Sequence, residues 1–190
     1  MANLSREEII VKIRNGESLA DLDLTRIDLS YEILKGVNLA GLNMREAHLQ
    51  NANLEGANLT DTDLAGAFMF GCNLHKAVLD RACLDNTNMQ DCNLTEASLK
   101  NAHGEHVALF GSSLEKADLR GARFPNARMK RAVLRQALLD EADFNHAHME
   151  RSDFSGASCQ NTILSHAALT NSKIDPQILA HAKTDGVVGL

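Results

Sequence analysis

The side chains best suited to chemistry in this 190-residue chain are its histidines, its four cysteines and its paired carboxylates. His106, His146 and His166 recur at one regular spacing or at twice that spacing, and imidazoles that lie side by side can bind a divalent metal ion. No column of cysteines or carboxylates completes an obvious ligand shell at this spacing. We therefore expect polar stacking on a solvated surface, and neither a metal nor another cofactor.

Cysteine chemistry is also expected to be limited. No basic stretch followed by an apolar run opens the sequence, so we expect reduced thiols in the cytoplasm rather than a disulfide framework. Cys72 and Cys92 are separated by the same interval as His146 and His166, within disulfide range if they stack in neighbouring layers. Parallel side-chain directions would disfavour that bond.

Acid–base catalysis has little support in the sequence. The adjacent carboxylates Asp140 and Glu141 fall at outward positions, where surface acids titrate in the ordinary way, and no GxxxxGK[ST], HExxH or CxxC motif is present. A filled apolar interior also leaves no pocket for a substrate. We predict that the protein is not an enzyme.

All these side chains are positioned by a repeat of five residues. From Leu19 to Ile174, every fifth residue (position i) is Leu, Met, Phe or Ile in 30 of 32 places. Position i−2 holds Ala, Ser, Thr or Cys in 25 of 32 repeats, and position i−1 holds Asn or Asp in 13. A period of five fits neither a helix nor an ordinary strand, so the chain must bend once per repeat. Glycine and asparagine gather at i+2, where they tolerate the positive φ of a corner.

Four such bends, one per repeat, would close a roughly square coil. The pattern, as in NANLEGANLTDTDL, resembles the pentapeptide-repeat family, whose motif is written A(D/N)LXX. The resemblance implies an all-β fold, a right-handed quadrilateral parallel β-helix of about eight coils, roughly 38 Å long at the usual strand spacing. Gly104 breaks the pattern at position i. His103, Phe110 or a local bulge could compensate for it.

The two ends of the repeat need covers. Ser5 and Glu8 form the pattern of a capping box, and Gly16 is a helix terminator. We therefore expect a capping helix in residues 1–17, the β-helix in 18–176, and in 177–190 a tail that either caps the last coil or forms a homodimer. Glu32 stands at a nominally inward position, so the first coil is expected to be irregular.

Residues four repeats apart share a column, so outward charges can be assigned to four faces. The first face is centred on Leu19 and Leu39, the second on Leu24, the third on Leu29 and the fourth on Leu34. The first two faces each carry six acids and three bases, and the whole chain carries a formal charge of −6. Candidate residues of this acidic surface are Asp63, Asp85, Asp118, Asp140, Glu141 and Asp143.

Some pentapeptide-repeat proteins bind DNA gyrase by imitating duplex DNA, which confers quinolone resistance. The resemblance therefore makes gyrase a possible partner. A duplex as long as this rod carries about 22 phosphates, far more than the charge available here. The acids could equally keep a rod rich in Ala and Leu soluble.

A second candidate surface consists of aromatic residues at outward positions. Phe68, Phe70 and Phe110 fall on the third face, and Phe70 and Phe110 share a column two coils apart. Exposed Phe residues are typical of protein-binding surfaces, although stacked rings also shield a β surface. The same face holds Arg128, Lys130, Arg131 and Arg151 near its C-terminal end.

We predict a non-catalytic, rod-like protein-interaction or structural module of bacterial type whose partner is an unknown protein. The alternative is a DNA-mimic protein that binds DNA gyrase, and a structural subunit in targeting or secretion is a third possibility. The acidic composition argues against direct binding of nucleic acid. No window holds the roughly 18 apolar residues that a membrane span needs.

Overall fold

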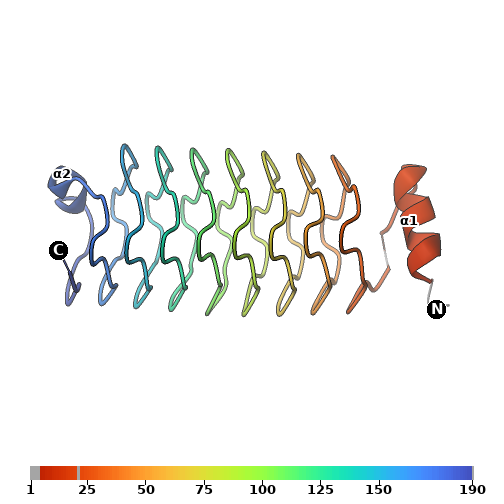
Figure 1. Cartoon of the computed structure of the whole chain (residues 1–190), viewed down its shortest axis with the longest axis horizontal. Coiled ribbons are helices and arrows are strands. Elements are labelled where there is room, and N and C mark those ends of the chain that lie inside the picture. Colours follow the sequence, from red (N-terminus) through yellow and green to blue (C-terminus); the bar gives the residue numbers. More distant parts are fainter. Residues whose placement is uncertain (1–4, 21, 190) are drawn as a thin grey trace.

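The chain winds into a rod of stacked coils with a helix at the N-terminal end (Figure 1). The computed structural model describes residues 5–20 and 22–189, with helices α1 (Arg6–Arg14) and α2 (Pro176–Leu179). Parallel β-bridges join residues four repeats apart, from Asp23 with Asn43 to Ala168 with Val188. The fold is therefore the predicted right-handed quadrilateral β-helix, and one coil takes four repeats.

The backbone hydrogen bonds explain why five residues make a stable unit. In the repeat centred on Leu54, the N–H groups of Asn53, Leu54 and Gly56 donate to carbonyls of adjacent coils at 2.9, 2.7 and 2.8 Å. The N–H of Ala57 donates across the corner to Leu54 at 3.0 Å, and the N–H of Glu55 donates to the Asn53 side chain at 3.1 Å. All five donors are satisfied, as buried or crowded backbone requires.

The corner at i+2 takes a left-handed backbone conformation throughout the described coils. Glycines such as Gly56 and Gly71 have φ of 64° and 69° there, and so do non-glycine residues such as Asn51 (57°) and Glu46 (55°). The prediction that position i+2 marks the corner is confirmed. Each coil can therefore turn with the same geometry, which keeps the columns in register over the length of the rod.

Positions i and i−2 form one continuous apolar core. Leu54, Leu74 and Leu94 are fully buried in one column, and Ala52 and Ala57 fill the smaller inward positions. Cys72, Cys92 and Cys159 are buried and unbridged, and Cys83 is half-buried at an outward position, in agreement with the predicted sides. The interior is filled by side chains and offers no channel.

Hydroxyl and thiol groups at i−2 add a second, internal set of hydrogen bonds. Thr62 Oγ1 donates to the carbonyl of Leu39 at 2.9 Å, and Ser152 Oγ donates to Met129 at the same distance. Cys72 Sγ donates to Leu49 in the same way at 2.8 Å. Each acceptor is the inward residue i of an adjacent coil, so a small polar side chain is buried here without an unsatisfied donor.

Gly104 is accommodated by its neighbour Val107. A Cβ at Gly104 would lie 2.6 Å from Val107 Cγ2 and 2.7 Å from the backbone carbon of Leu84. Val107 stands at i−2, where most repeats carry Ala, and it is fully buried. The ladder stays intact, because Gly104 N–H donates to Arg123 at 2.9 Å. A large and a small residue have exchanged places, and neither His103, Phe110 nor a bulge is needed.

Helix α1 covers part of the first coil. The predicted capping box is present, with Glu8 N–H donating to Ser5 Oγ at 3.2 Å and Ser5 N–H to Glu8 at 2.7 Å. Ile9 and Ile10 are buried against the core. Glu32, the irregular inward residue, binds Arg6 at 2.8 Å and Arg14 at 3.6 Å, so it anchors the helix to the coil.

The C-terminal end differs from the predicted stop at Pro176. After the short helix α2, the ladder resumes where Lys183 pairs with Ile163 and Val188 pairs with Ala168. Ala182 and Val187 continue the spacing of position i−2 and pack against the core. The segment therefore adds part of a further coil. The last residue of the predicted tail, Leu190, lies outside the described residues, as do residues 1–4 of the predicted N-terminal cap.

Candidate interaction surfaces

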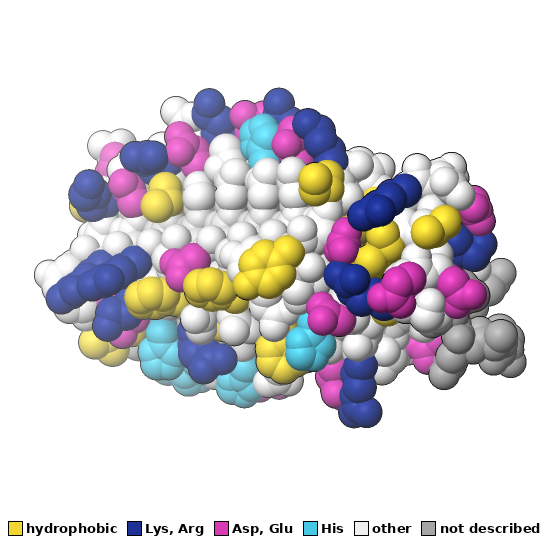
Figure 2. Space-filling model, turned by 45° about the vertical axis from the view of Figure 1, so that its right-hand side comes forward, with side chains coloured by type: hydrophobic (Ala, Val, Ile, Leu, Met, Phe, Trp, Pro, Cys, Tyr) yellow, Lys and Arg dark blue, Asp and Glu magenta, His cyan; other side chains and the backbone are white. Residues whose placement is uncertain are grey.

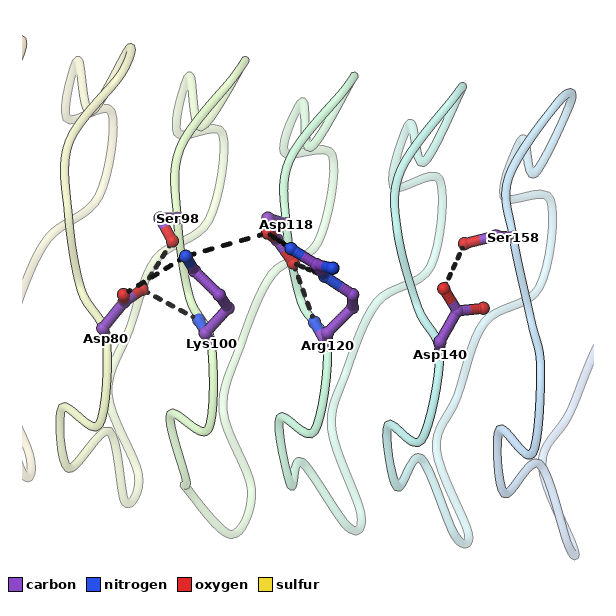
Figure 3. A network of polar contacts seen from close by, with 7 residues as sticks. All are labelled: Asp80, Ser98, Lys100, Asp118, Arg120, Asp140 and Ser158. Atoms are coloured by element: carbon purple, nitrogen blue, oxygen red, sulfur yellow. Dashed lines mark hydrogen bonds and ion pairs between the residues drawn. The ribbon is translucent and has the colours of Figure 1, made fainter.

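The first face carries a chain of alternating charges that we call the acidic network: Asp80, Lys100, Asp118, Arg120 and Asp140 (Figure 3). Arg120 binds both carboxylate oxygens of Asp118, at 2.9 and 2.7 Å. Lys100 Nζ lies 3.8 Å from Asp80 and 4.0 Å from Asp118, and so bridges three coils. Positive and negative groups therefore alternate along this face.

The carboxylates of the acidic network are held by local donors. Burial opposes the ionisation of Asp118, but hydrogen bonds from Arg120 and the nearby charge of Lys100 outweigh it and hold the pKa of Asp118 below its ordinary value. Asp140 accepts hydrogen bonds from Ser158 Oγ at 3.0 Å and from Gln160 N–H at 2.9 Å. These acids stabilise the coil-to-coil contacts in which they take part.

The other predicted acidic residues are dispersed over the first two faces. Asp63 pairs with Arg45 at 3.1 Å, Asp85 accepts a hydrogen bond from Glu105 N–H at 2.7 Å, and Asp143 accepts one from Asn145 N–H at 2.9 Å. Glu141 is exposed at a corner. The six residues form no uninterrupted row of free carboxylates.

The third face presents what we call the aromatic–basic surface: Phe68, Phe70, Phe110, Arg128, Lys130, Arg131 and Arg151. Phe68 and Phe70 are each 42% exposed. In the part of the chain that the structure describes, twelve Lys and Arg side chains form ion pairs with carboxylates, and none belongs to this surface. Hydrophobic side chains lie in rows along the rod with histidines beside them (Figure 2).

The three Phe rings lie on one face but contact different partners. Phe68 stacks on His48, with ring centroids 4.9 Å apart, and the guanidinium of Arg131 lies 5.8 Å from the centre of the Phe110 ring. This last contact joins the aromatic part of the surface to its basic part. The carboxylate of Glu150 lies in the same column as Phe110 and Lys130, and its buried Oε2 has no hydrogen-bond partner among the described residues.

Metal and thiol chemistry find little support in the geometry. His146 and His166 stack with centroids 4.7 Å apart, but no cluster of three or more potential ligands occurs within residues 5–20 and 22–189. Burial raises the pKa of the Cys159 thiol to about 11, and a hydrogen bond with Cys72, reinforced by burial, raises the pKa of Cys92. Burial also raises the pKa of Cys83. Protonated thiols are poor nucleophiles and poor metal ligands.

A third surface, at the N-terminal end, was not predicted. Tyr31 and Ile33 are 75% and 78% exposed, beside a groove of about 650 Å³ between the end of α1 and the first coil. Its lining includes Ile13, Leu19 and Val37. The signal in the sequence was a bulky apolar residue at outward positions of the first coil, where the repeat itself is irregular.

None of the helices that the structure describes has the length and apolar character needed to cross a membrane.

Comparison with known proteins matches the chain to the family model of pentapeptide repeats, in eight copies between residues 23 and 174. A search of curated proteins finds no match. Among solved structures, HetL, a pentapeptide repeat protein involved in regulating heterocyst differentiation in the cyanobacterium Nostoc sp. strain PCC 7120, is 23% identical. The alignment covers 97% of this chain and 94% of HetL, with a TM-score of 0.43.

Two further structures are similar. QnrB1, a plasmid-mediated fluoroquinolone resistance protein, is 19% identical over 80% of this chain and 91% of its own, with a TM-score of 0.46. The pentapeptide repeat protein alr5209 from Nostoc is 30% identical over 55% of this chain and 84% of its own, also with a TM-score of 0.46.

Proposed function

Since this chain belongs to the pentapeptide-repeat family, we propose that it is a non-catalytic rod that binds a partner protein through the aromatic–basic surface of its third face. The observation that carries this proposal is the contrast between its four cations, which lack a carboxylate partner in the described chain, and the paired cations of the acidic network. Unpaired cations beside half-exposed rings are free to contact a partner.

The chemistry of the surface defines the partner. Phe68 and Phe70 offer apolar area that a complementary pocket would cover, and aromatic residues and Arg are enriched among residues that dominate binding energy. The cations in the next coils would meet acidic side chains and speed association. The partner is therefore a protein with an apolar pocket beside an acidic patch.

Binding to DNA gyrase is the second candidate, and it rests on the net negative charge of the first two faces. The acidic network weighs against it, because Lys100 and Arg120 interrupt the row of acids in consecutive coils. A DNA-like surface would present regularly spaced, unpaired negative charges. Homodimerisation through the C-terminal tail and a cytoplasmic location stay predictions.

The test is affinity capture from a lysate with matched variants, with a gyrase supercoiling assay in parallel. Phe70→Ser on the third face should remove the captured protein, whereas Leu138→Ser on the first face, with a similar exposure of 38%, should retain it. Both variants should melt like the parent, since neither side chain is part of the core. Equal capture by the two variants would contradict a role of the third face.

The gyrase assay separates the two candidates. If the aromatic–basic surface is the binding site, the protein should leave supercoiling unchanged. Inhibition or protection of gyrase that weakens in Asp63→Asn, Asp85→Asn and in raised salt would instead favour the second candidate, because screening acts on the acidic faces.

A further inference from the structure

The first coil has an open β edge on the side that α1 leaves uncovered. In later coils, the N–H at i−1 donates to an earlier coil, as Asn53 does to Glu32 at 2.9 Å. The corresponding N–H groups of Ile33 and Asn38 have no hydrogen-bond partner within residues 5–20 and 22–189. The carbonyls of Ile33, Lys35 and Asn38 also accept no hydrogen bond from those residues, although their equivalents one coil later, such as Asn53 and Glu55, do.

The unpaired groups have a regular spacing that defines what would satisfy them. By the offsets of the ladder, a preceding layer would present two carbonyls, to the N–H groups of Ile33 and Asn38. It would present three N–H groups, to the carbonyls of Ile33, Lys35 and Asn38. An extended segment of about eight residues in the parallel direction carries all five groups in one register. Free edges of this kind pair readily with an added strand.

The chain itself does not supply this layer. The residues that would lie one coil before Ile33 and Asn38 belong to α1 and to the segment that follows it, because Ile13 is helical and Ser18 makes no bridge to Asn38. The groove of about 650 Å³ occupies the vacated position, with Ile13 on one side and Leu34 and Val37 on the other. An inward aliphatic side chain of an added segment would enter this apolar space.

The charged residues around the groove are already neutralised. Lys35 pairs with Glu55 at 2.9 Å, Arg14 lies 3.6 Å from Glu32, and Lys12 pairs with Glu17 at 2.7 Å. The exposed side chain of Ile33 would lie beside an outward side chain of the added segment, and an aliphatic residue there would cover it. The edge is therefore complementary to a segment without net charge that carries aliphatic residues.

We propose that the open edge of the first coil, from Ile33 to Asn38, is a docking site for an extended, uncharged and aliphatic segment of a partner protein, which adds to the β-helix as a further parallel strand. A second copy of the rod does not fit the same place. Helix α1 stands over part of the first coil (Figure 1), so the flat end of another rod cannot approach, whereas a single extended segment can lie beside the helix. The site is separate from the aromatic–basic surface of the third face.

The chain provides a probe with the required chemistry. The capped peptide Ac-VLRQALLD-NH₂, which copies residues 133–140, has no net charge and would place Val133 over Ile33 and Leu134 over Leu34. The acetyl carbonyl would accept from Ile33 N–H. The matched control is the same peptide methylated at the backbone nitrogens of Leu134 and Leu139. It keeps every side chain but loses two of the three ladder donors.

The binding experiment uses the full chain and fluorescein-labelled peptides. The unmethylated peptide should bind, and methylation should weaken binding by about tenfold or more, as the loss of two hydrogen bonds requires. Absence of binding at millimolar protein or peptide, or equal affinity of the two peptides, would overturn the proposal. A concentration-dependent dimer that excludes the peptide would also overturn it, in favour of a second copy.

Two variants and an amide measurement locate the site. Ile33→Pro removes a backbone donor that is unbonded in the free protein and should abolish peptide binding, whereas Ile33→Ala keeps the donor and should only weaken it. In the parent chain, hydrogen exchange at the amides of Ile33 and Asn38 should slow at least tenfold when peptide is added. Unchanged exchange at both amides would overturn the proposal even if Ile33→Pro failed to fold.

Discussion

The first and third faces rest on the same backbone ladder and the same apolar interior, yet their side chains do different things. On the first face, Lys100 and Arg120 are bound to carboxylates in their own and neighbouring coils. On the third face, Arg128 and Lys130 lie beside exposed rings and form no ion pair in the described part of the chain. Identical geometry therefore carries a face that stabilises the rod and a face that is available to a partner.

The largest expected effect comes from a change that disturbs both faces at once. In Gly104→Ala, the new Cβ would lie 2.7 Å from the Leu84 carbon and 2.6 Å from Val107 Cγ2, and the backbone contact cannot be relieved by a rotamer change. Overpacking of this kind should lower the free energy of unfolding by about 1–3 kcal/mol. Thermal melting would measure it.

The matched control is Gly56→Ala. Its Cβ meets nothing within 4 Å, but φ is 64°, so only the backbone preference is lost, at about 1 kcal/mol. A melting temperature of Gly104→Ala equal to or above that of Gly56→Ala would contradict the explanation of Gly104.

A smaller effect should distinguish the two faces directly. Arg120→Ala removes the bidentate partner of Asp118 and should cost roughly 0.5–1 kcal/mol of unfolding free energy, because the arginine is half-exposed. Arg128→Ala removes a cation without a carboxylate partner and should cost nothing measurable. Urea unfolding at neutral pH and low salt would compare them. If Arg128→Ala were as destabilising as Arg120→Ala, the functional contrast between the faces would be lost.

The smallest effect concerns acid stability. The pKa of Asp118 is lowered in the folded state, so its contribution is fully present above the pKa of the unfolded chain, near 4, and is lost as pH falls through the lower folded value. Asp118→Asn should therefore reduce stability at pH 7 but have little further effect below about pH 3. Leu138→Ser, on the same face without a titrating group, should shift stability equally at both pH values. A parallel pH dependence for both variants would contradict the assigned role of Asp118.

Most of the fold could be predicted from the sequence because the repeat couples every fifth residue to the core. The corners at i+2, the inward cysteines and the capping box of Ser5 and Glu8 all follow from local rules and are observed. The continuation past Pro176 was missed because a proline and a short helix interrupt the motif, although Ala182 and Val187 keep its spacing.

The candidate surfaces were less predictable. Columns predict which outward residues are neighbours, and they placed His146 beside His166 and Phe110 two coils from Phe70. They do not predict the direction of long side chains, so the pairing of Lys100 with both Asp80 and Asp118 could not be foreseen. The open edge at Ile33 depends on where α1 lies, which is set by the contacts of Glu32 with Arg6 and Arg14.

The constant offset of four repeats between bridged positions has a consequence for how such a chain can change in length. Removing or duplicating one whole coil would leave each later side chain on its original face, merely shortening or lengthening the rod. Removing a single repeat would preserve the inward residues but rotate everything downstream by a quarter turn, so that residues of the third face would come to lie on the second. Natural length variation in multiples of four repeats would keep a binding face intact, whereas a single-repeat deletion would dismantle it without unfolding the protein.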